Sequence, residues 1–209
     1  MISVRVIPAL ITSAILGLGS LLTAQSNAIE LRGQVEISLQ GGCYYCPPIT
    51  RYVIHGSETP IRSNTIDLSA FVGLYVKVDG TWSMVGAQPV IDVTSVLAVA
   101  PALNIAGNAR IGNTLRWSTA GAPGELAVQV LSFGASFVPV VGTAVLLLDP
   151  SSILIVGAGS IDPSGSFRTD LPIPNSTLLI GRHIFGQSLI APGGSAPFYF
   201  SNPETKRIQ

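Results

Sequence analysis

Alternating polar and apolar residues in the first half of the chain predict strands. Gln34–Leu39 and Leu74–Val78 follow this pattern most clearly. Asp79-Gly80 after the second run favours a hairpin turn, and Ser69–Val72 favours one helical turn that Asp67 could cap. Further strands are predicted at Tyr52–His55, Trp82–Val85 and Val90–Val99.

The second half repeats short apolar runs between turn residues, which is typical of an antiparallel β-sandwich. Asp162-Pro-Ser-Gly165 matches a type I turn, and the small residues Ala98–Ala102 indicate a boundary between two units. The predicted strands are Ile111–Ser118, Leu126–Phe133, Ala144–Leu148, Ile153–Val156, Gly165–Asp170, Leu178–Gly181, Phe185–Ile190 and Ala196–Phe200. We therefore expect an all-β protein with a small barrel at 29–98, a β-sandwich at 103–203 and a tail at 204–209.

The N-terminus has the three parts of a secretory signal. Arg5 precedes the apolar segment Val6–Ala24, and Ser26 and Ala28 are small residues at positions −3 and −1 of a cleavage site. The apolar segment is also long enough to remain as a membrane anchor, although Pro8 and the small residues favour cleavage. We expect residues 1–28 to be a signal peptide and the protein to be located in the periplasm, on the envelope exterior or outside the cell. No membrane span is expected after cleavage.

Composition narrows the class of protein. Charged residues make up 11% of the chain and hydrophobic residues 47%, which excludes a disordered protein and a coiled coil. Eleven basic residues balance eleven acidic ones, and loss of Arg5 with the signal would leave a net charge of −1. A nucleic-acid partner is therefore not expected, because such binding needs an excess of positive charge.

The residues of the first half fit a known pattern. Leu68, Phe71, Gly73, Val76 and Val78, followed by a further glycine at Gly80, resemble secreted OB-fold-like domains over residues 29–96. The resemblance implies a five-stranded barrel, and such barrels bind oligonucleotides or oligosaccharides on their surface.

The second half resembles a β-rich terminal domain of uncharacterised secreted bacterial proteins. The resemblance implies a fold and an exported location, and no particular activity. It is carried by Gly112–Trp117, Gly121–Gly124, Asp162–Gly165, Leu171–Pro174, Leu179–Gly181, Gln187 and Ser201-Asn202.

Cys43-Tyr-Tyr-Cys46 is the sharpest local motif. In an exported chain with no other cysteine, a structural disulfide between Cys43 and Cys46 is favoured. Free thiols, a redox pair and a metal site are the alternatives. Pro47-Pro48 follows instead of a helix, so the thiolate-stabilising helix N-terminus of a redox pair is absent, and heme attachment would need a histidine at position 47.

Aromatic residues of the first half could form a ligand platform, made of Tyr44, Tyr45, Tyr52 and Trp82. The nearby basic residues are Arg32, Arg51, Arg62 and Lys77. The alternative is that Trp82 and Phe71 belong to the core and that the tyrosine pair flanks the disulfide.

Catalytic motifs are not evident in the sequence. It contains no Gly-x-Ser-x-Gly elbow, its carboxylates are scattered, and His55 and His183 are interpreted as surface residues. We expect no enzyme, no cofactor and no metal, but a secreted or cell-surface binding or structural module with an unknown ligand or envelope component as partner. The alternatives are a thiol–disulfide oxidoreductase using Cys43 and Cys46, and an oligosaccharide- or oligonucleotide-binding barrel.

Overall fold

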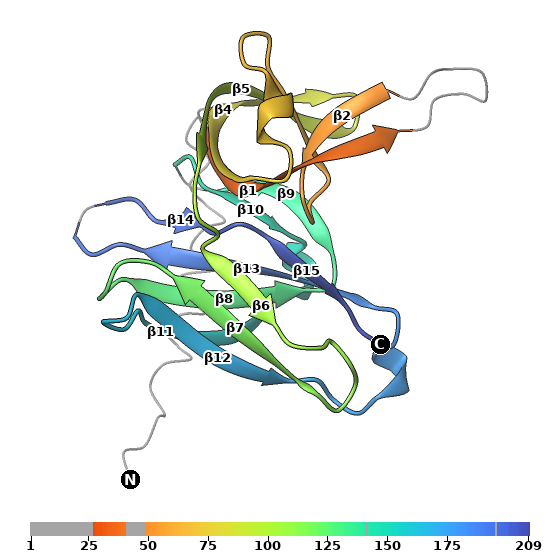
Figure 1. Ribbon diagram of the computed structural model, residues 1–209, viewed down its shortest axis with the longest axis vertical. Helices are drawn as coiled ribbons and strands as arrows, with labels where there is room; N and C mark the ends of the chain where they lie inside the picture. The colour runs from red at the N-terminus through yellow and green to blue at the C-terminus, as the bar shows by residue number, and fades with distance from the viewer. Residues whose placement is uncertain (1–26, 41–48, 141, 195) are drawn as a thin grey trace.

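A computed structural model of the chain describes residues 27–40, 49–140, 142–194 and 196–209. The part it describes is all-β, with several separate sheets and only short 3₁₀ turns as helices, which confirms the predicted class. Residues 1–26 of the predicted signal peptide lie outside the described residues. Figure 1 shows the first half of the chain above the second half, with β9 and β10 between them.

The first half forms a closed ring of five strands in the order β1-β2-β3-β5-β4. All neighbouring strands run antiparallel except β3 and β5, which are parallel at Ile61 and Ile91. The 3₁₀ helix η2 (Leu68–Phe71) connects β3 to β4, and Asp67 caps it as predicted. The strands are β1 (Ala28–Gln40), β2 (Ile49–Ile54), β3 (Thr59–Arg62), β4 (Tyr75–Val85) and β5 (Gln88–Ala98).

The second half contains three sheets. A three-stranded sheet has the order β12-β7-β6, and a five-stranded sheet has the order β11-β8-β13-β14, with β15 also pairing with β13. The strands are β6 (Leu103–Ala106), β7 (Thr114–Ala120), β8 (Leu126–Ser132), β11 (Leu154–Ser160), β12 (Ser166–Pro172), β13 (His183–Ala191), β14 (Tyr199–Phe200) and β15 (Glu204–Arg207). The third sheet pairs β9 (Ala135–Pro139) with β10 (Val145–Leu148).

The two larger sheets share one apolar core around Trp117, which is completely buried on β7. Gly186 on β13 lies against the indole ring, and a Cβ atom at this position would be 2.5 Å from Trp117 Cζ3 and Cη2. The absence of a side chain at Gly186 therefore makes room for the tryptophan between the sheets.

The β9–β10 hairpin joins the second half to the ring. Val145 and Leu147 of β10 belong to the same apolar cluster as the ring interior, and Phe137 of β9 packs on it. The amide of Glu30 donates a 2.7 Å hydrogen bond to the carbonyl of Thr143. The ring thus completes its core with residues that lie beyond the predicted boundary at Ala98–Ala102.

Buried amide side chains make a second connection. The Asn202 carboxamide accepts hydrogen bonds from the Ala102 and Leu103 amides at 2.8 and 2.9 Å, and donates to the Leu103 carbonyl at 2.9 Å. The Gln187 carboxamide accepts from the Leu147 amide at 2.9 Å. Asn202 therefore holds the connection between the halves, and Gln187 holds β10. The predicted division into two domains stays a prediction.

The hairpin turn predicted at Asp79-Gly80 is wrong. Strand β4 continues through both residues, and its register against β5 shifts between them, as in a β-bulge. Gly80 lies so close to the carbonyl oxygen of Asp92 that a side chain would collide with it. The glycine serves a close approach of two strands, and the chain turns at Gly86-Ala87 instead.

Other predicted boundaries also change. The strand predicted at Leu178–Gly181 is wrong, because Thr177–Leu179 form a 3₁₀ turn in which the Ile180 amide donates to the Thr177 carbonyl. Leu178 is 84% exposed and has no core to face. In the segment expected to be a tail, Glu204–Arg207 form β15 and pair with His183–Gly186.

Candidate functional site

The ring carries a cavity of about 500 Å³ over β2 and β3. This volume is within the usual range for small-molecule sites. The connection from β3 to β4 and the β4–β5 hairpin border it. We call this cavity the groove. It is lined by Arg51, Tyr52, Pro60, Ile61, Arg62, Ser63, Ile66, Asp67, Leu68, Val85, Gln88 and Val90.

Strand pairing positions the aromatic residue of the groove. Tyr52 lies opposite Ile37 of β1 and Ile61 of β3. Its half-buried phenol side chain packs on the apolar core of the five-stranded ring. The short strand β3 pairs with β2 on one side and with β5 on the other. The groove therefore combines residues from strands that are far apart in sequence.

Two arginines contribute to the groove in different ways. Arg62 Nε donates to Asp92 Oδ1 at 2.6 Å and Nη2 donates to Oδ2 at 3.1 Å, a two-pronged ion pair. This hydrogen bonding lowers the pKa of Asp92 and raises that of Arg62. Arg51 Nη1 donates instead to the amide oxygen of Gln88 at 3.2 Å, a neutral partner.

The connection between β3 and β4 is held by local hydrogen bonds. The Ser63 hydroxyl donates to the Val93 carbonyl at 3.0 Å and accepts from the Ile66 amide at 3.1 Å. The Asp67 carboxylate accepts from the hydroxyl and the amide of Ser69, which lowers the pKa of Asp67. Asp67 thus places a stable negative charge at this side of the groove.

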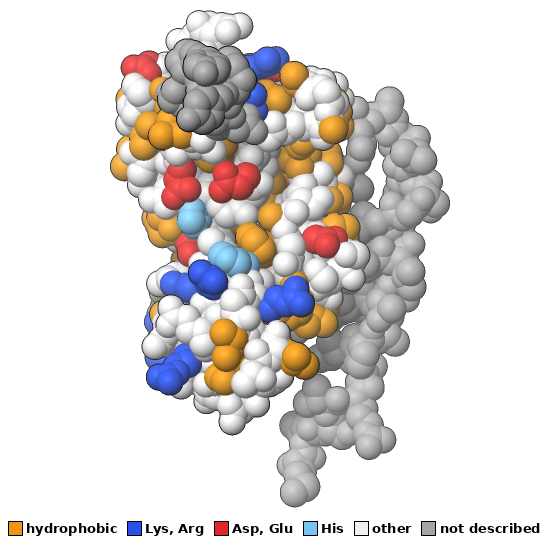
Figure 2. Space-filling model, turned by 90° about the vertical axis from the view of Figure 1, so that its right-hand side faces the viewer, with side chains coloured by type: hydrophobic (Ala, Val, Ile, Leu, Met, Phe, Trp, Pro, Cys, Tyr) orange, Lys and Arg blue, Asp and Glu red, His pale blue; other side chains and the backbone are white. Residues whose placement is uncertain are grey.

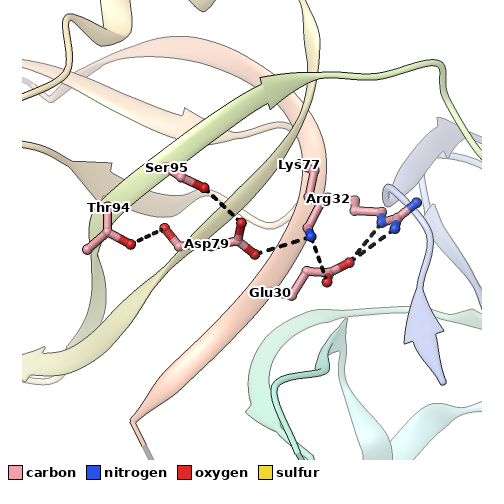
Figure 3. Close-up of polar contacts among 6 residues, drawn as sticks. All are labelled: Glu30, Arg32, Lys77, Asp79, Thr94 and Ser95. Atoms are coloured by element: carbon pink, nitrogen blue, oxygen red, sulfur yellow. Dashed lines mark hydrogen bonds and ion pairs between the residues drawn. The ribbon is translucent and has the colours of Figure 1, made fainter. Parts of the chain in front are cut away.

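The other basic residues of the ring belong to an ion-pair network on β1 and β4 (Figure 3). Glu30 pairs with Arg32 and with Lys77, both at 3.1 Å, and Lys77 also lies 3.5 Å from Asp79. The hydrogen bond to Glu30 is the main cause that raises the pKa of Lys77. Arg32 further lies 4.0 Å from the centroid of the Tyr199 ring on β14, so this network also contacts the second half.

The structure places only part of the predicted aromatic platform. Tyr52 lines the groove, whereas Trp82 does not line it and packs against Phe137 with ring centroids 5.6 Å apart. Tyr44 and Tyr45 lie outside the described residues, as do Cys43 and Cys46, so the predicted disulfide stays a prediction.

The two histidines are separate from the groove. His55 Nδ1 lies 2.8 Å from a carboxylate oxygen of Glu36, and His183 stacks on Phe185 with centroids 6.2 Å apart. Over the described ranges, no three His, Cys, Asp or Glu side chains are grouped as metal ligands. Figure 2 shows acidic side chains mainly on the upper part of one face and basic side chains mainly on its lower part, with histidine side chains between them.

Comparison with known proteins adds no relative: no protein-family model matches the chain, and no curated protein matches it. Within the part of the chain that is described, no helix has the length and apolar character needed to cross a membrane.

Sequence reasoning identified Tyr52 as a candidate but missed most of the groove. Arg51 and Arg62 were recognised only as charges of the same half, and Gln88 and Val85 were not singled out. No spacing in the sequence links these residues. They come together because the closure of the ring brings β2, β3 and the β4–β5 hairpin close to one another.

Proposed function

We propose that the protein is an exported binding module without catalytic activity, and that its ring holds an oligosaccharide in the groove. The observation that carries the proposal is the 500 Å³ cavity with an aromatic ring, two guanidinium groups and neutral polar groups along its wall. A tyrosine offers a sugar both an apolar face and a hydroxyl group, and Gln88 offers an amide. The signal-like N-terminus supports a location in the periplasm or on the cell exterior.

The closed ring of five strands and the position of the groove on it support an OB-like barrel. An OB-fold is a five-stranded, partly open barrel that uses the face of strands 2 and 3 and the loop between strands 4 and 5 for binding. Here the groove lies over β2 and β3, and Val85 and Gln88 come from the two strands of the β4–β5 hairpin. The location of the groove therefore agrees with the resemblance seen in the sequence.

The balance of charge favours a saccharide over single-stranded nucleic acid. Three of the four basic residues of the ring have a carboxylate partner, at distances of 2.6–3.1 Å. Phosphate backbones need several free cations, and their binding releases counterions in proportion. A mostly neutral ligand needs hydrogen-bonding groups instead.

The second half, in this proposal, is a β-sandwich that supports the ring. Its two larger sheets share the core around Trp117, and its β9–β10 hairpin supplies apolar side chains to the ring interior. The contacts of Asn202 with Ala102 and Leu103 further limit movement between the halves. This arrangement would present the groove on a rigid base.

A pair of neighbouring substitutions tests the groove. Val85 lines it and Met84 does not, although both lie on β4 and are 52% and 55% exposed. On a glycan array, we expect wild type and Met84→Trp to bind the same saccharides and Val85→Trp to lose at least about tenfold in affinity, because the indole would obstruct part of the groove.

Two results would contradict the proposal: equal binding by both variants, or no saccharide binding by the wild type. A parallel titration with single-stranded oligonucleotides includes the alternative ligand. Binding of those strands in preference to glycans would replace the saccharide with nucleic acid.

A further inference from the structure

The groove is lined by charges of both signs. Among the four basic side chains of the ring, Arg51 is the one whose recorded partner is neutral, because Arg32 and Lys77 pair with Glu30 and Arg62 pairs with Asp92. Arg51 therefore brings a positive charge to the groove that no carboxylate of the described residues balances within ion-pair distance. The Arg62–Asp92 pair beside it is internally neutral.

Asp67 provides the opposite charge. Its carboxylate is held by Ser69 at the start of η2, so its position is determined by the fold. Arg51 and Asp67 both line the groove but form no ion pair with each other in the part of the chain that is described. The groove thus has a positive group on β2 and a negative group on the β3–β4 connection.

Each charge prefers a different part of a ligand. A guanidinium group binds a carboxylate through two parallel hydrogen bonds, and these are stronger than bonds between neutral groups. A carboxylate accepts hydrogen bonds from hydroxyl groups and repels another carboxylate. A ligand that is acidic along its whole length would therefore meet repulsion at Asp67, and a fully neutral ligand would leave Arg51 without a charged partner.

We infer that the groove selects a saccharide in which one carboxylated sugar adjoins neutral sugars, with the carboxylate at Arg51 and sugar hydroxyls at Asp67. This inference rests on the proposed function of the groove and adds the class of ligand. Tyr52 and Gln88 lie beside Arg51, where the tyrosine side chain and the glutamine amide contact the acidic sugar. The Gln88 amide oxygen accepts a hydrogen bond from the Arg51 guanidinium and so restrains it before the ligand arrives.

Calorimetric titration with three trisaccharides tests the inference on the full exported chain. The probes are glucuronosyl-xylobiose, which has one carboxylate, xylotriose, which has none, and trigalacturonic acid, which has three. We expect the first to bind at least about tenfold more tightly than the other two, because a charged hydrogen bond typically contributes that factor. Its affinity should also fall as salt is added, since the key contact is ionic.

Variants of Arg51 separate charge from shape. Arg51→Gln keeps an amide near Gln88 but removes the charge, so it should lose about tenfold for glucuronosyl-xylobiose and change little for xylotriose. Arg51→Lys should retain a measurable preference for the acidic probe. Arg116→Gln, which breaks an exposed pair with Asp170 on the second half, is the matched control and should bind like wild type.

The outcomes distinguish the acidic specificity of the groove from saccharide binding as such. Equal binding of xylotriose and glucuronosyl-xylobiose, blocked by Val85→Trp, would overturn the acidic specificity and leave the saccharide groove intact. Failure of all three probes would overturn the inference, and failure of a glycan array as well would overturn the proposed function. Tighter binding of triglycine, whose ammonium and carboxylate also match the two charges, would replace the saccharide with a peptide terminus.

Discussion

The interior of the ring consists of apolar side chains from all five of its strands, whereas the second half contains a buried series of hydroxyl and amide groups beside its apolar core. In the described part of the chain, seven of the eight buried polar side chains belong to the second half: Thr119, Gln129, Ser132, Gln187, Ser188, Ser201 and Asn202. Among the residues whose burial is described, the ring contributes only Thr59.

This difference shows two ways of specifying a β structure. A closed ring has neighbours on both sides of every strand, so its backbone is paired and an apolar interior is sufficient to define it. The open sheets of the second half have edges and ends, and buried amides such as Gln187 and Asn202 bond to backbone groups there. A buried hydrogen bond is directional, so it also defines which segment lies against which.

The largest expected effect comes from Asn202→Ala. The change removes the partner of two amide groups, Ala102 and Leu103, and of the Leu103 carbonyl, and each unsatisfied buried group costs about 1–3 kcal/mol. We expect the free energy of unfolding to fall by about 3 kcal/mol or more in urea, followed by tryptophan fluorescence. Trp82 reports on the ring and Trp117 on the second half.

Asn175→Ala is the control, because Asn175 is exposed. A loss below about 1 kcal/mol for Asn202→Ala would show that water replaces the amide and that the connection is weak.

A smaller effect distinguishes the two interiors directly. Thr119→Val keeps the shape of the side chain but removes the hydroxyl that bonds with Gln129 at 3.0 Å and Ser188 at 2.7 Å. We expect a loss of about 2 kcal/mol although the residue becomes more apolar. Ile91→Val in the ring removes one methylene group and should cost about 1 kcal/mol. Urea unfolding of both variants checks the order, and an increase in stability for Thr119→Val would contradict it.

The smallest effect depends on pH and concerns the contact between the two regions. Tyr75 of β4 donates a 2.9 Å hydrogen bond to Glu204 of β15, and burial, aided by this bond, raises the pKa of Tyr75 to about 12. An unfolded tyrosine ionises near pH 10. Because the folded pKa is the higher one, the contribution of Tyr75 is complete below about pH 10 and is lost as pH rises towards 12.

Tyr75→Phe should therefore lower the stability by about 1 kcal/mol at pH 8, and its difference from wild type should shrink between pH 10 and 12. Urea unfolding at a series of pH values measures this. A difference that stays constant over the series would show that folding does not raise the pKa of Tyr75.

The sequence predicted local structure better than contacts. Alternation identified the strand at Gln34–Leu39, although only Val35 of its apolar residues is buried and Ile37 and Leu39 are exposed. The strand at Leu126–Ser132 was identified as a short apolar run, and most of its residues are buried. Asp79-Gly80 misled the prediction, since the same two residues suit a hairpin turn and a bulge, and the choice depends on Asp92 of the neighbouring strand. The strand at β15 was missed because its pairing with β13 is a matter of tertiary structure.

The groove shows the same limit. Tyr52 was a candidate because aromatic residues have a recognisable chemistry, but the difference between Arg51 and Arg62 depends on which strand brings Gln88 or Asp92 to each of them. Spacing along the chain contains no such information. The partners of the two arginines are determined by which strands are neighbours in the closed ring.

The fit of Gly186 against Trp117 has a consequence for how this chain can change over generations. Any side chain at position 186 would occupy space that the indole already fills, and a smaller residue at position 117 would leave a void where the glycine stands. Each single substitution is therefore disfavoured while its neighbours remain, and a side chain at position 186 would also need space that Ile105 occupies. Positions far apart in the sequence are in this way constrained by one packing contact.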